Sequence, residues 1–237
     1  MYKFVINLKR RPDRLELFKK KCPYPIGQEV KTNFIGKLLT DKPKINQVNI
    51  IYGFDSKQTC DEIPEEQFLY KHVIKLKLPG AIGCFISHLR IYKIIVENNY
   101  TEAIIFEDDA NFTIDFDKKL QRVIKQLPMD YHIIYIGGRF VENFKMKNEN
   151  MTAVSDNICK HNLNNWCNFD HDRTTHGYII SNAGAKFLLE KIKNTTINQQ
   201  DAIDFWLMNT FKNKNINIYN SFPLLCWSPI VGDSDIR

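Results

Sequence analysis

The sequence has no paired-cysteine motif, although it contains 6 cysteines in 237 residues. No CxxC pair is present, and the cysteines and histidines do not follow the spacing of a zinc site. Several cysteines lie in apolar neighbourhoods, which favours reduced, buried thiols over disulfides. The cysteines therefore predict neither a zinc-stabilised domain nor a disulfide scaffold.

Long hydrophobic runs and blocks of basic residues are also absent. No stretch approaches the roughly 20 apolar residues of a membrane span, and the apolar start Met1–Leu8 is too short for a signal peptide or an anchor. We therefore expect a cytoplasmic chain without a transmembrane segment. The net charge of +6 is dispersed. It suits a small polyanion such as a nucleotide diphosphate and gives no specific support for nucleic-acid binding.

What the sequence does contain is enough apolar material, 43% of residues, for a full-sized core. Apolar runs typical of strands alternate with segments at helical spacing, and no internal repeat is present. The expected strands are 4–8, 48–53, 103–106, 132–136, 177–181 and 216–219; the expected helices cover 12–18, 81–97, 117–126, 182–192 and 201–211. This alternation predicts an α/β fold with a mostly parallel sheet flanked by helices. The polar stretch 141–172 is expected to be a long loop or lid.

Several polar motifs directly follow expected strands. They are the basic turn 9–14, the acidic triplet Glu107-Asp108-Asp109 and the pair Gly137-Gly138. Because ligands of such sheets bind outside the carboxyl ends of the strands, we expect these motifs to converge on one edge.

The acidic triplet comes straight after the apolar run 104–106. Three adjacent carboxylates repel one another, and a hard divalent cation relieves that repulsion by accepting oxygen ligands. Residues i and i+2 of an extended chain point the same way, so Glu107 and Asp109 are the expected metal ligands. Asp108 is expected to face elsewhere, toward a ribose hydroxyl. The alternative is an acidic turn that merely starts a loop.

Five separated motifs, in order, resemble those of glycosyltransferase family 25, the group of lipopolysaccharide sugar transferases and collagen galactosyltransferases. They are FVINLKRRPDRL at 4–15, GAIGCFISH at 80–88, IFEDD at 105–109, THGYIIS at 175–181 with GAK at 184–186, and DAID at 201–204 with the closing SDIR at 234–237. Together these motifs are distributed along nearly the whole chain.

The resemblance implies a GT-A fold in a single domain, 1–237, with a nucleotide-binding part at about 1–140 and an acceptor part at about 141–237. It also implies a UDP-sugar donor, a divalent metal (Mn²⁺, or Mg²⁺) and inversion at the anomeric carbon. Galactose or glucose is the expected hexose, and a glycan or a hydroxylysine-type hydroxyl is the expected acceptor. The sequence itself leaves the sugar, the acceptor and the oligomeric state open.

Inversion needs a general base that deprotonates the acceptor hydroxyl. Asp204 is our first choice and Asp201 the second, since a spacing of three puts both on one helical face. Either residue could instead simply favour the amino terminus of its helix. Asp233 is the expected third metal ligand. The residues expected to contact the nucleotide sugar are Asn7, Arg10, Arg11, Arg14, Ser87, His88, Asp108, His176 and Gly177.

Two alternative functions stay open on the sequence alone. A metal-dependent phosphoesterase also uses carboxylates, but it normally adds several histidines or a two-metal cluster, and the histidines here are scattered. A degenerate glycosyltransferase domain would bind a nucleotide sugar without transferring it. The intact triplet and Asp204 argue against that second alternative.

Overall fold

The computed structural model describes residues 1–33, 36–55, 79–139, 151–161, 174–194, 203–211 and 216–228. The helices in these ranges are α1 (Pro12–Lys21), α3 (Pro79–Glu97), α4 (Phe116–Lys125), α5 (Asn182–Asn194) and α6 (Ile203–Phe211). The strands are β1 (Tyr2–Asn7), β2 (Ile26–Glu29), β3 (Val48–Tyr52), β4 (Glu102–Glu107), β5 (Asn111–Phe112), β6 (Ile133–Tyr135), β7 (Gly137–Arg139), β8 (Met151–Ser155), β9 (Ile158–His161), β10 (Gly177–Ser181), β11 (Ile218–Ser221) and β12 (Cys226–Ser228).

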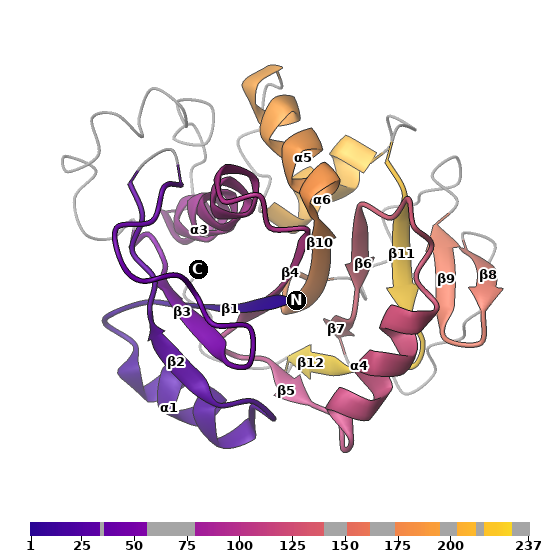
Figure 1. Ribbon diagram of the computed structural model, residues 1–237, viewed down its shortest axis with the longest axis horizontal. Coiled ribbons are helices and arrows are strands. Elements are labelled where there is room, and N and C mark those ends of the chain that lie inside the picture. Colours follow the sequence, from indigo (N-terminus) through magenta and orange to yellow (C-terminus); the bar gives the residue numbers. More distant parts are fainter. Residues whose placement is uncertain are drawn as a thin grey trace.

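The described strands form one large mixed sheet and one small sheet (Figure 1). The large sheet has nine strands in the order β2-β3-β1-β4-β10-β6-β11-β9-β8, and the small one has the order β5-β12-β7. Strands β2, β3, β1 and β4 run parallel, and β10 then lies antiparallel between β4 and β6. The predicted α/β fold is confirmed, with the parallel pairing concentrated in the amino-terminal half.

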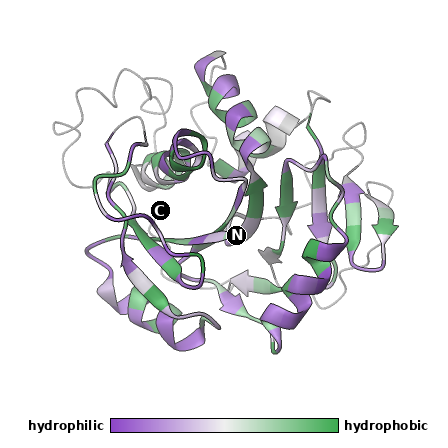
Figure 2. Cartoon of the chain, viewed as in Figure 1, coloured by the Kyte–Doolittle hydropathy of each residue, from purple (hydrophilic) through white to green (hydrophobic). Residues whose placement is uncertain are grey.

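Helices cover both faces of the large sheet, which explains why its strands are continuous apolar runs. Successive residues of a strand point to opposite faces. Phe4 and Ile105 therefore share a core with α3, α5 and α6, whereas Val5 and Ile104 share a second core with α1 and α4. In Figure 2 the central strands are hydrophobic, and α1 and α4 carry hydrophilic residues on their outer sides.

Helix α3 is buried on most of its sides, because it packs between the large sheet and helices α5 and α6. The apolar side chains on several sides of α3 therefore contact protein instead of water. Neither α3 nor any other helix in the described ranges combines the length and the apolar character needed to cross a membrane.

Several strands were not predicted from the sequence, among them β2, β5, the hairpin of β8 and β9, and β12. Part of 141–172, expected to be a loop or lid, is the β8–β9 hairpin, which joins the large sheet through β11. Its anchors are Ile158 and Cys159, both buried, and two apolar residues are too few to give a strand pattern. The remainder of that stretch lies outside the described residues. The tail after β11 contains β12, which pairs with β5 and with β7, the strand that Gly137-Gly138 opens.

Candidate active site

The carboxyl ends of β1, β3 and β4 meet the segment before β10 at one cavity, as strand-end geometry predicts. In the parallel pairing Ile6 lies beside Glu107 and Asn7 beside Tyr52, and the Glu107 N–H donates to the carbonyl oxygen of His176. Nine of the predicted site residues line the cavity: Asn7, Arg10, Arg14, Ser87, His88, Glu107, Asp108, Asp109 and His176.

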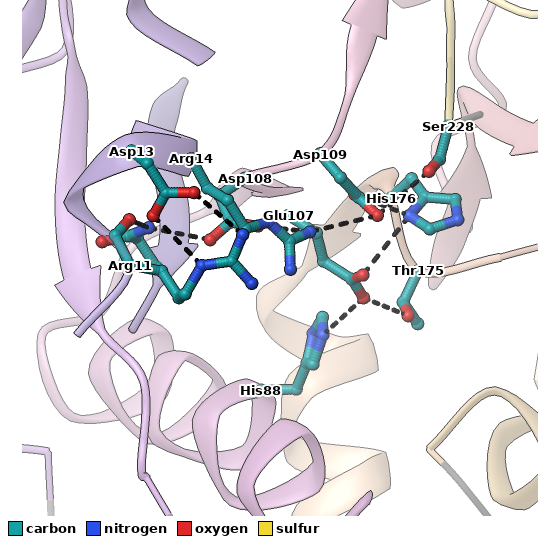
Figure 3. Close-up of polar contacts among 11 residues, drawn as sticks. Arg11, Asp13, Arg14, His88, Glu107, Asp108, Asp109, Thr175, His176 and Ser228 are labelled. Carbon is teal, nitrogen blue, oxygen red and sulfur yellow. Dashed lines mark hydrogen bonds and ion pairs between the residues drawn. The ribbon is translucent and has the colours of Figure 1, made fainter. Parts of the chain in front are cut away.

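Glu107 lies at the centre of a polar network (Figure 3). His88 Nε2 is 3.2 Å from its Oε1 and His176 Nδ1 is 3.3 Å from its Oε2, while the Thr175 hydroxyl donates to Oε1. Burial alone would raise the pKa of Glu107, but the hydrogen bonds from His176 and His88 hold that pKa well below its usual range. Glu107 is therefore a carboxylate at neutral pH.

Asp109 shares His176 with Glu107. Its Oδ1 lies 3.0 Å from His176 Nδ1, and its Oδ2 accepts a hydrogen bond of 3.0 Å from the Ser228 hydroxyl. Burial lowers the pKa of His176, yet the hydrogen bonds to Asp109 and Glu107 outweigh it and raise that pKa to about 10. At neutral pH the imidazolium therefore neutralises part of the charge of the two carboxylates.

Asp108 has partners on β1 and α1, and its predicted contact with a ribose hydroxyl stays a prediction. Its Oδ1 pairs with Arg14 Nη2 at 2.8 Å, and its Oδ2 accepts a hydrogen bond of 2.8 Å from Asn7 Nδ2. Burial raises the pKa of Asp108 to about 7, although Arg14 and Asn7 act in the opposite direction. The same Arg14 nitrogen reaches Asp109 at 3.4 Å, so one guanidinium spans two members of the triplet.

The residues around the triplet also fit a divalent metal. Glu107, Asp109 and His176 each offer a ligand atom, and these atoms lie within 4.8 Å of one another. Carboxylate oxygens with an imidazole nitrogen suit Mn²⁺, and carboxylates alone suit Mg²⁺. A cation at this place would substitute for the shared proton of His176. His176, predicted to contact the donor sugar, is thus also a candidate third ligand, whereas Asp233 lies outside the described residues.

Ser87 and His88 line the cavity from α3 and also stabilise its wall. The Ser87 hydroxyl donates to the Gly83 carbonyl oxygen at 2.5 Å and accepts a hydrogen bond of 2.9 Å from the Phe54 N–H. It therefore fastens the segment after β3 to α3. Since the carboxylate of Glu107 can only accept, His88 Nε2 carries the proton between them, and Nδ1 accepts from the Tyr178 hydroxyl at 2.7 Å.

Two residues expected to contact the nucleotide sugar do not line this cavity. Arg11 pairs through Nε and Nη2 with Asp13, at 3.0 and 2.9 Å. Gly177 is buried in β10, where an added Cβ would lie 2.3 Å from Cys226 Sγ. The physical reason for glycine at 177 is thus close packing against β12.

Of the two proposed general bases, Asp204 belongs to the described part of the chain. Asp204 is half-buried in the first turn of α6 and does not line the cavity. Burial raises the pKa of the Cys84 thiol, and the negative charges of Glu107 and Asp204 raise it further. Asp201 lies outside the described residues.

Sequence reasoning missed two partners of the triplet and one partner of Arg10. Thr175 belongs to the recognised motif at 175–181, but no sequence pattern indicates that its hydroxyl donates to Glu107. Ser228 carried no signal, because it meets Asp109 across 119 positions of sequence. Asp55 pairs with Arg10 at 2.7 Å and so fixes a guanidinium in the cavity wall.

A sheet that collects carboxylates, guanidinium groups and imidazoles at its strand ends is suited to a phosphorylated ligand. A sequence model described as glycosyltransferase family 25 (LPS biosynthesis protein) matches residues 1–206. The chain belongs to this family, so the resemblance and the expected enzyme class, a glycosyltransferase, are confirmed at the level of the family.

Several animal proteins are similar to the chain. Procollagen galactosyltransferase 2 of Homo sapiens is 28% identical over 194 residues, which cover 78% of this chain and 27% of the human protein. Procollagen galactosyltransferase 1-A of Xenopus laevis is 30% identical over 190 residues, with the same coverage of both chains. The glycosyltransferase 25 family member of Aedes aegypti is 26% identical over 237 residues, covering 94% of this chain and 35% of that protein. The chain thus spans about a quarter to a third of the length of these relatives.

Proposed function

We propose that the chain is a metal-dependent, inverting glycosyltransferase that moves a hexose from a UDP-sugar to an acceptor hydroxyl. The observation that carries this proposal is the arrangement of Glu107, Asp109 and His176 around one point in the wall of a strand-end cavity. Relatives named procollagen galactosyltransferases make galactose the first sugar to test and glucose the second. A hydroxylysine-type hydroxyl or a glycan hydroxyl is the acceptor class.

Different residues of the chain would hold the metal and the phosphates of the donor. Glu107, Asp109 and His176 would hold Mn²⁺ or Mg²⁺, which stabilises the departing diphosphate when bound. Arg10 and Arg14 offer guanidinium groups to phosphate oxygens from the β1–α1 segment. The nucleotide-binding part is therefore proposed at about 1–140.

Asn7 supports a donor contact at the same wall. Its side chain is 1% exposed, and its Oδ1 has no hydrogen-bond partner among the described residues. A buried acceptor without a partner is costly, and an N–H or O–H of a ligand would satisfy it.

The acceptor part is proposed at about 141–237, with Asp204 as general base and Asp201 as the second choice. Asp204→Asn keeps the size of the side chain and removes the proton acceptor. We expect it to lower the rate of UDP release at saturating donor by at least about 100-fold, with little change in Mn²⁺-dependent UDP binding. An unchanged rate would remove Asp204 from this role.

A screen of UDP-sugars with Mn²⁺, read as UDP release in the presence of hydroxylysine-containing peptides and simple glycans, tests the proposed function. Asp109→Asn is expected to reduce turnover by about 100-fold or more, because it removes a ligand charge. Asp13→Asn is the matched control, since Asp13 lies on the exposed side of α1. Turnover that survives Asp109→Asn unchanged would refute the metal assignment.

One observation favours a second candidate, a nucleotide-sugar-binding module. Each carboxylate of the triplet already has protein partners, chiefly Arg14, His88 and His176. The negative charge of the triplet is therefore compensated without a metal. A module of this kind would bind UDP equally well with and without Mn²⁺ and would release no UDP from any donor.

A further inference from the structure

A second group of ligand atoms lies on another side of Glu107. Cys84, His88 and Glu107 each offer one atom, and these atoms lie within 4.8 Å of one another. His88 faces Oε1 of Glu107, whereas His176 faces Oε2, and the two imidazoles approach the carboxylate from different sides (Figure 3). Glu107 is therefore shared between two donor sets.

The position of Cys84 and His88 on α3 suits a common ligand. They are four residues apart on one helix, so their side chains lie one turn apart on the same face. Both line the cavity. The two donor sets differ chemically, because only this one contains sulfur, and thiolate ligands select zinc-like ions over Mg²⁺ and Mn²⁺.

The surroundings of His88 resemble those of a metal-bound imidazole. His88 is fully buried, and its Nδ1 lies 2.7 Å from the Tyr178 hydroxyl, which lies 2.8 Å from the Tyr92 hydroxyl. Ligating histidines usually make such a hydrogen bond through the nitrogen that does not touch the metal. A phenol can donate or accept, so Tyr178 accommodates the tautomer that frees Nε2 for a metal.

We propose that Cys84, His88 and Glu107 bind Zn²⁺ or another thiophilic divalent ion, with a fourth position open to the cavity. Binding forms metal bonds to Sγ, Nε2 and Oε1; the thiol proton leaves to solvent, and the imidazole proton moves from Nε2 to Nδ1, where the Tyr178 hydroxyl accepts it in a hydrogen bond. Because Glu107 also belongs to the set proposed for Mn²⁺, zinc at this place inhibits sugar transfer. The inhibition rests on the proposed function, whereas the binding does not.

Cobalt in place of zinc tests the binding directly, because a thiolate–Co²⁺ bond absorbs in the near ultraviolet. The metal-free full-length wild type is expected to develop this band on titration with Co²⁺. Cys84→Ser should lose it and bind Co²⁺ at least about tenfold more weakly, whereas Cys22→Ser, at the end of α1, should keep it. A band that persists in folded Cys84→Ser overturns the proposal.

A second measurement needs no variant. Zn²⁺ is expected to slow alkylation of Cys84 in the wild type at least about tenfold, read by peptide mass spectrometry, whereas Mg²⁺ at the same concentration should not. Equal alkylation rates with and without Zn²⁺ overturn the proposal.

The inhibition has its own test. In the Mn²⁺-supported assay, Zn²⁺ should suppress UDP release in the wild type and be at least about tenfold less potent against Cys84→Ser. Zinc that binds without inhibiting overturns the shared use of Glu107. A chain that releases no UDP from any donor overturns the proposed function instead and leaves the cobalt band to decide the metal site.

Discussion

At the scale of single residues, Arg14 and His176 neutralise part of the negative charge of the acidic triplet. The sequence showed three repelling carboxylates, and the folded chain places a guanidinium and an imidazolium among them. The site therefore offers ligand atoms for a cation, and protein groups keep these atoms in place without one. The exact positions of the two outer carboxylates then depend on neutral neighbours such as Thr175 and Ser228.

Ser228 is expected to position Asp109. In Ser228→Ala the Oδ2 atom loses its hydroxyl donor, and the carboxylate gains freedom to turn away from the metal. We expect the Mn²⁺ concentration needed for half-maximal UDP release to rise about tenfold, with a smaller change at saturating Mn²⁺. Ser155→Ala is the control, because the Ser155 hydroxyl lies at the end of β8 and donates to Gln126 instead of to the triplet. A change confined to the maximal rate would contradict a positioning role.

His132 makes the stability of the fold depend on pH. Burial lowers its pKa below 6.5, although Asp130 acts the other way, and its Nδ1 accepts a hydrogen bond from the Asn217 N–H. The folded state therefore binds fewer protons than the unfolded state just below pH 6.5. This contribution to stability is complete above about pH 6.5 and is lost as the pH falls through the folded-state pKa.

His132→Asn keeps an acceptor near the same place and cannot titrate. Urea unfolding at pH 7 and pH 5 should show a smaller loss of unfolding free energy in this variant than in the wild type. Equal losses in the two proteins would show that other groups determine the acid sensitivity.

At the scale of elements, β12 pairs with β7, and the sulfur atom of its Cys226 packs closely against both β7 and β10. Cys226 Sγ lies where two glycines leave room, 2.7 Å from an added Cβ at Gly137 and 2.3 Å from one at Gly177. This close approach brings Ser228, two residues along β12, within reach of Asp109.

Gly177→Ala is expected to destabilise the fold by about 1–3 kcal/mol, because its Cβ would overlap Cys226 Sγ. In a Cys226→Ala background the same change should cost less, since the methyl group fills the space the sulfur leaves. Gly184→Ala is the matched control. Its Cβ would meet the His132 carbonyl oxygen at 2.4 Å, which Cys226→Ala cannot relieve. Equal costs of Gly177→Ala in the two backgrounds, by urea unfolding, would contradict this packing account.

The sequence predicted elements well where apolar spacing is strong, and poorly where it is not. Strand β4 and helix α3 carry long apolar patterns and appear as expected. The β8–β9 hairpin and β12 have few buried residues, and their pairing partners are distant in sequence. The proposal that Glu107 and Asp109 bind a metal followed from local chemistry, whereas the contacts of Arg14 and Ser228 depend on tertiary packing that no local pattern encodes.

At the scale of the whole molecule, metal and nucleotide are expected to stabilise the fold cooperatively, because we propose that both bind at one cavity. Mn²⁺ or UDP alone, at about 100 times its dissociation constant, should raise the unfolding temperature by roughly 5–10 °C, and the two together should produce a larger shift. This shift should exceed the sum of the separate shifts, and Asp109→Asn should abolish the excess. Thermal denaturation with each ligand alone and together measures it, and strictly additive shifts in the wild type would argue against a joint site.

The place of β11 in the sheet has a consequence for the order of folding. Strands β1 to β4 are all complete by residue 107, but β11, from Ile218–Ser221, inserts between β6 and β9, which precede it in the chain. On the ribosome, the half of the sheet that bears the triplet can assemble early, while β6 and the β8–β9 hairpin keep open edges until β11 has been synthesised. Glu107 and Asp109 are thus synthesised long before Ser228, and the contact between Ser228 and Asp109 forms only after residue 228 has emerged.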